Sequence, residues 1–72
     1  MTLSNVQPGE TIEILSIPDE TVRVQAIRLG IYEGAHIQCS DKISRGPVIL
    51  RRRMQEMAIG HELAKQIKVR VI

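Results

Sequence analysis

The sequence predicts a mainly β protein, a small barrel of about five short strands with one short α-helix over about 20–29 and a second helical turn over about 61–66. Three observations support this fold class. The chain has only 72 residues, which is room for one domain over 1–72. Glycines and prolines recur at short, fairly even spacing, as turns do. Between them, apolar and polar residues alternate with the period of a half-buried strand.

The first strand is expected over 10–17. Ile12 and Ile14 share one face, but Leu15 and Ile17 fall on the opposite parity. One extra residue reverses the face that later side chains occupy, so this pattern fits a β-bulge near Leu15. A strand end that is buried on both faces fits the same residues.

The segment over 20–29 fits two structures. Val22 and Ala26 agree both with the alternation of a strand and with the spacing of one helical face. We favour a helix, because Asp19 can cap its start and Gly30 can end it. This helix would lie across one open end of the barrel.

Four further strands are expected, separated by an exposed loop over 41–46 and by the helical turn. Their ranges are 35–40, 47–53, 56–59 and 67–72. In the second of the five strands, alternation directs one set of residues inward and the other outward. The inward set is Ala35, Ile37 and Cys39, and the outward set is His36, Gln38 and Ser40.

Composition excludes several classes of protein. The formal charge of +2 and a single aromatic residue, Tyr32, argue against nucleic-acid binding, which needs dense basic charge or stacking rings. The single cysteine, Cys39, excludes an intrachain disulfide. No apolar run approaches a bilayer span, and the N-terminus lacks a signal core. We expect a cytoplasmic protein without membrane insertion.

The small size favours a binding or regulatory module over an enzyme, because a deep substrate cleft would hollow out so small a core. No nucleophile–base set and no phosphate-binding loop of the GxxxxGK[ST] type is present. We therefore expect no catalytic activity and no catalytic residues.

Three residues are candidate ligands for a transition metal: His36, Cys39 and His61. Such a site needs three or four ligands in matched geometry, whereas alternation places His36 and Cys39 on opposite faces of their strand. We expect a buried structural cysteine and two surface histidines. Any Fe²⁺ or Zn²⁺ binding would be weak or would bridge two molecules.

The densest charge is Arg51-Arg52-Arg53. In a strand, Arg51 and Arg53 would share one face, with Arg52 across from them. One interpretation is a basic patch for an acidic partner, a phosphate or a membrane surface. The other is a solvated outer face, paired with Glu13 or Glu56.

Several segments together resemble the FeoA family. The segment Arg28-Leu29-Gly30-Ile31-Tyr32-Glu33-Gly34-Ala35-His36-Ile37 is similar to a characteristic family motif. Agreement extends to Pro8-Gly9-Glu10, to Gly46-Pro47-Val48-Ile49-Leu50, and to the closing segment around Ala64 and Ile67-Lys68-Val69. The chain departs from the family at Arg53-Met54-Gln55, where members often carry a glycine.

The resemblance implies an SH3-like β-barrel and a non-enzymatic accessory role in bacterial ferrous-iron uptake. The implied partner is the cytoplasmic part of a FeoB-type transporter, which carries a GTP-binding domain. We expect a monomer or weak homo-oligomer without a cofactor. The alternative is a barrel that senses a transition metal, like the C-terminal domain of iron-dependent repressors.

Partner contacts are expected where apolar and arginine side chains remain exposed at the helix end and in the turn after the third strand, since such residues often anchor interfaces. The residues are Arg28, Leu29, Ile31, Tyr32, Arg51, Arg53 and Met54. For Leu29 and Ile31, the alternative is that they plug the barrel end.

Overall fold

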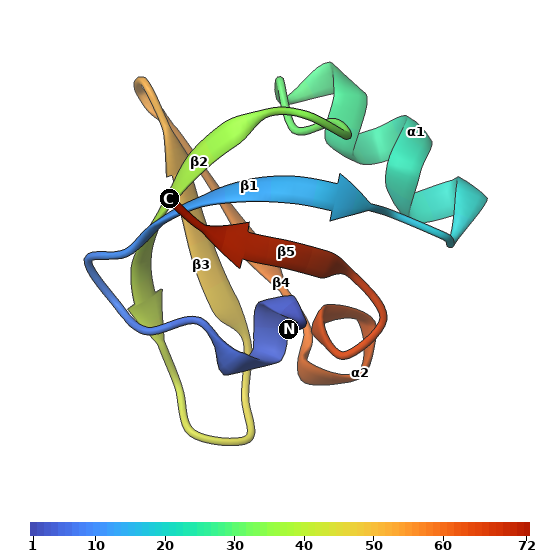
Figure 1. Ribbon diagram of the computed structural model, residues 1–72. Coiled ribbons are helices and arrows are strands. Elements are labelled where there is room, and N and C mark those ends of the chain that lie inside the picture. Colours follow the sequence, from blue (N-terminus) through green and yellow to red (C-terminus); the bar gives the residue numbers. More distant parts are fainter.

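Five antiparallel strands form one curved, barrel-like sheet in the computed structural model, which describes residues 1–72 (Figure 1). The strand order is β4-β3-β2-β1-β5. The elements are η1 (Leu3–Asn5), β1 (Thr11–Ser16), α1 (Glu20–Arg28), β2 (His36–Lys42), β3 (Val48–Arg52), β4 (Gln55–Ile59), α2 (His61–Ala64) and β5 (Lys68–Val71). The predicted mainly β fold with five strands and two helices is confirmed.

The predicted bulge in β1 is confirmed. The pairing of β1 with β5 shifts register between Ile14 and Ser16. As a result, Ile12 and Ile14 are buried on one side of the irregularity and Ile17 is buried beyond it, whereas Leu15 is exposed. The extra residue lets both halves of this segment supply the same core despite their opposite parity.

Helix α1 lies at the end of the barrel where β1 ends and β2 begins (Figure 1). The Asp19 carboxylate accepts a hydrogen bond from the Val22 amide at 3.0 Å and so caps the helix start. Only Val22 and Ala26 of the helix are buried. The helix ends at Arg28, one residue earlier than expected.

The other elements differ from their expected ranges at the ends. β2 continues to Lys42, so part of the expected loop over 41–46 belongs to a strand. The second helical turn is helical over His61–Ala64 and continues as a turn through Gln66. Neither α1 nor α2 has the length and apolar character that crossing a membrane would require.

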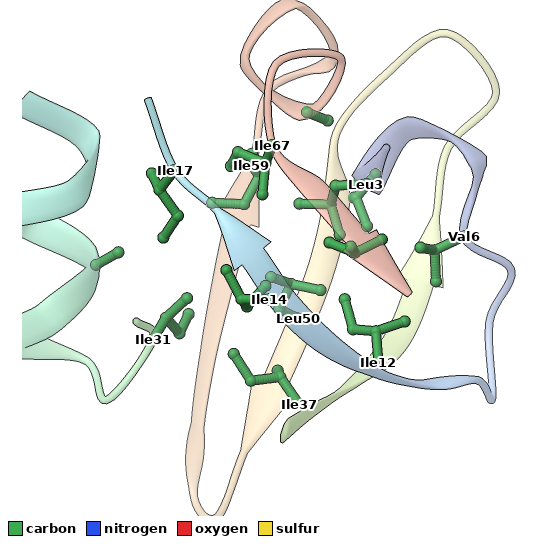
Figure 2. Packing of buried hydrophobic residues seen from close by; sticks show 14 of the residues in the cluster. Leu3, Val6, Ile12, Ile14, Ile17, Ile31, Ile37, Leu50, Ile59 and Ile67 are labelled. Carbon is green, nitrogen blue, oxygen red and sulfur yellow. The ribbon is translucent and has the colours of Figure 1, made fainter. Parts of the chain in front are cut away.

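Seventeen buried residues, all of them apolar or cysteine, fill the barrel (Figure 2). Leu3 and Val6 are both completely buried, although they precede every strand. Their segment follows β5: the Leu3 amide donates to the Ile67 carbonyl at 2.8 Å, and the Val69 amide donates to the Met1 carbonyl at 3.0 Å. The N-terminal segment therefore covers the core beside the β5 edge.

Cys39 faces this core from β2, as the alternation predicts. Its Sγ donates to the Asp41 carbonyl at 3.3 Å. Burial raises the pKa of the Cys39 thiol above its ordinary value of 9.0, because the thiolate would lose its hydration. The side chain therefore packs as a neutral thiol.

Replacing Leu3 with alanine is expected to lower the free energy of unfolding by about 2–4 kcal/mol, because the substitution leaves a cavity in a tightly filled core. Urea denaturation would measure the loss. The matched control is Leu15→Ala, whose side chain is 48% exposed and whose loss should cost less than about 0.5 kcal/mol. Equal losses for the two variants would contradict the role given to the N-terminal segment.

The Cys39 thiol should make stability fall at high pH. Its folded-state pKa is raised, so unfolding releases a proton once the pH exceeds the ordinary value of 9.0. The stabilisation is complete below that value and is lost as the pH rises toward the folded-state pKa. Urea denaturation of wild type and Cys39→Ala between neutral pH and about pH 10 would measure this. Parallel pH profiles of the two proteins would contradict it.

Candidate binding surface

The C-terminal end of α1 is fixed by backbone hydrogen bonds around Gly30. The Gly30 amide donates to the Ile27 carbonyl at 3.0 Å, and the Ile31 amide donates to the Ala26 carbonyl at 2.9 Å. This is the pattern of a Schellman motif, which places the residue after the C-cap in the left-handed region. Gly30 has φ of 80°, so the glycine that the sequence suggested as the helix end has that role.

The β3–β4 hairpin projects at the same end of the barrel as α1 (Figure 1). Arg52 pairs with Gln55, which leaves Arg53 and Met54 as a two-residue turn. Arg53 has φ of 56°. Tight hairpin turns often need positive φ and usually take glycine or asparagine there; here Arg53 adopts this conformation, and the turn is short without a glycine. Met54 at the tip is 97% exposed.

Arg52 connects this hairpin to the end of α1. Its Nη1 donates a hydrogen bond to the Gly30 carbonyl. The guanidinium carbon also lies 5.3 Å from the centre of the Tyr32 ring, within range of a cation–π contact. Because a planar guanidinium satisfies both contacts at once, the hairpin and the helix end are held in a defined relation.

A hollow of about 170 Å³ lies between these two segments. We call it the arginine hollow, and the residues that line it are Arg28, Leu29, Gly30, Arg52, Arg53 and Gln55. None of its three arginines forms an ion pair; the ion pairs of the chain are Arg51–Glu56, Lys65–Glu62 and Arg70–Glu13. The lining contains no carboxylate, so these three arginines have no carboxylate partner within the hollow.

Most of the expected contact residues lie at this end of the molecule. Arg28, Leu29 and Arg53 line the hollow. Tyr32, which is 43% exposed, lies under Arg52, and Met54 follows Arg53 at the tip. Leu29 is half-buried and also packs against the core, so it has both of the roles that the sequence left open.

Arg52 is the residue that sequence reasoning missed. The signal was its parity: it lies two residues after Leu50, which is buried, and four after Val48. Alternation therefore directs Arg52 to the inward-facing side of β3, where the strand end leaves it half-buried. An arginine on the core side at the end of a strand must find a polar partner.

Two expectations about side-chain placement are wrong. Ile31 is not an exposed contact residue; it is 4% exposed and packs into the barrel end (Figure 2). Arg51 and Arg53 do not share one face of a strand, because β3 ends at Arg52 and Arg53 belongs to the turn. Arg51 instead lies on the outer face, where its Nε is 3.8 Å from the Glu56 carboxylate.

The candidate metal ligands lie apart in the fold. His36 is exposed at the start of β2, Cys39 is buried in the core, and His61 opens α2. No three His, Cys, Asp or Glu side chains gather as a metal site would require.

Glu13 was the other expected ion-pair partner of the run Arg51-Arg52-Arg53. It instead forms an ion pair with Arg70 at 2.6 Å.

Comparisons with known proteins agree with this architecture. The family model described as the FeoA domain matches residues 1–71. A crystal structure of an iron uptake regulatory protein (FeoA) is 29% identical, with a TM-score of 0.84 over 100% of this chain and 97% of that one. The NMR structure of a FeoA-like protein from Clostridium acetobutylicum is 26% identical, with a TM-score of 0.77 over 100% and 86% of the two chains.

The FeoA protein from Chlorobium tepidum is 23% identical, with a TM-score of 0.85 over 100% of this chain and 70% of that one, and shows the shared fold. A search of curated proteins finds no match. The family match over nearly the whole length, together with the five-stranded barrel, leads to one conclusion: the chain belongs to the FeoA domain family.

Proposed function

We propose that this chain is a non-enzymatic accessory protein of ferrous-iron uptake, and that it acts by binding the cytoplasmic part of a FeoB-type transporter. The observation that supports the role in iron uptake most directly is the family match over residues 1–71. In addition, a protein named as an iron uptake regulatory protein is similar over the full length of this chain.

The surface around the arginine hollow is the proposed contact surface. It combines charged arginines with Tyr32 and Met54, the mixture of aromatic, methionine and arginine side chains that is enriched at protein interfaces. The side chain of Met54 is almost fully exposed at a projecting tip, so a partner can contact it without any rearrangement of the barrel.

The proposed activity consists of binding alone. The chain would act in the cytoplasm, next to the membrane but not in it. Any change in the transporter's nucleotide turnover would arise from this contact, and the proposal requires no resident metal ion or other cofactor.

Titrating the isotope-labelled protein with the soluble GTP-binding domain of its transporter tests the proposal. Amide NMR shifts are expected in Arg28–Tyr32 and in Arg52–Gln55. Met54→Ala should weaken binding about three- to tenfold, as loss of one interface side chain does. Ile43→Ala is the matched control, because Ile43 is also exposed, at 55%, and lies in the loop at the opposite end of β3.

Two results would contradict the proposal. One is the absence of any shift at high concentrations of the transporter domain and of the transporter's other cytoplasmic segments. The other is equal weakening by Met54→Ala and Ile43→Ala, which would place the contact elsewhere on the barrel.

A further inference from the structure

The charge in the arginine hollow has no counterion within this chain. Arg28, Arg52 and Arg53 line one small space, and no carboxylate lies among the lining residues. By contrast, the neighbouring Arg51 is paired with Glu56. Three like charges around one hollow repel each other, and a bound anion would relieve that repulsion.

We propose that the arginine hollow binds a carboxylate side chain from an acidic segment of the partner protein. This inference rests on the proposed function and names the chemistry of the partner at the same surface. A guanidinium presents paired N–H groups that match the two oxygens of a carboxylate, and such paired hydrogen bonds are stronger than neutral ones.

Arg52 prepares the hollow for an anion. The C-terminal end of a helix carries partial negative charge on its free carbonyls, which would repel an anion. The Arg52 Nη1 donates to the carbonyl of Gly30, just beyond the C-cap of α1, so the guanidinium charge lies beside the helix end and offsets its partial negative charge at the wall of the hollow. Since Arg52 is already held by Gly30 and by the Tyr32 ring, it loses little side-chain freedom on binding.

The size of the hollow also fits this ligand. About 170 Å³ is enough space for one or two acidic side chains. The exposed Met54 at the adjoining tip can pack against apolar residues that flank the acidic ones. A segment with both kinds of residue matches the surface better than a free phosphate, which would leave Met54 without a contact.

The test uses two blocked peptides of equal length, hexaglutamate and hexaglutamine, and inorganic phosphate as a third probe. Hexaglutamate should shift the amides of Arg28–Gly30 and Arg52–Gln55, and hexaglutamine should not. The shifts should decrease when ionic strength rises from about 0.05 M to about 0.3 M, because exposed charge pairs are screened over that range.

Matched double variants locate the binding. Arg28→Gln with Arg53→Gln should weaken binding of hexaglutamate and of the transporter domain about five- to twentyfold. The control is Arg51→Gln with Arg45→Gln, which removes two exposed arginines outside the hollow. The pairs also match in backbone conformation, because Arg45 and Arg53 both have positive φ, 59° and 56°. Arg52 is left unchanged because it holds the hairpin to the helix.

The outcomes separate this inference from the proposed function. If the transporter domain binds but the hollow variant and its control bind equally well, the carboxylate site is wrong and the proposed function stands. If hexaglutamate binds at the hollow but the transporter domain does not bind, the proposed function fails. Larger shifts with phosphate than with hexaglutamate, or hexaglutamate shifts centred outside the arginine hollow, would overturn the acidic segment as the ligand.

Discussion

The arrangement of the candidate surface depends on the hydrogen bond from Arg52 to the Gly30 carbonyl. Helix α1 buries only two side chains, so packing alone restrains it weakly, and its end needs a further attachment. Arg52 supplies this attachment from β3, and its contact with Tyr32 extends it to the loop that leads into β2. One side chain at the end of β3 therefore holds the helix end and the hairpin together.

The sequence predicts those elements of the fold in which apolar and polar residues alternate with a regular period. Alternation identifies the strands, and the change of parity at Leu15 identifies the bulge, because both follow from the faces that residues occupy. The buried N-terminal segment has no such signal, since Leu3 and Val6 pack from a 3₁₀ turn and an extended stretch. Their burial depends on β5, which pairs with β1 from the far end of the chain.

The candidate surface could be predicted only in part for a related reason. The sequence shows which of its residues are apolar and which are arginines. It does not show that the end of α1 and the β3–β4 hairpin lie next to each other and form a hollow. By residue type Arg52 is one arginine in a run of three, whereas its inward parity in β3 makes it the residue that connects the hairpin to the helix end. The core contains no buried polar or charged residue, so the chemistry of this chain lies on its surface loops and strand ends.

Arg53 has a left-handed backbone conformation, which lowers the stability of the fold, and its side chain supplies positive charge to the hollow. The two effects of this one residue are in conflict. A side chain other than glycine costs about 1 kcal/mol in that region, and a domain of this size has little free energy of unfolding in reserve. Glycine would relax the turn but would remove a guanidinium from the hollow. A substitution at the hairpin tip that raises thermal stability would therefore weaken binding. This trade-off arises in a surface turn and not in the core, which usually limits stability.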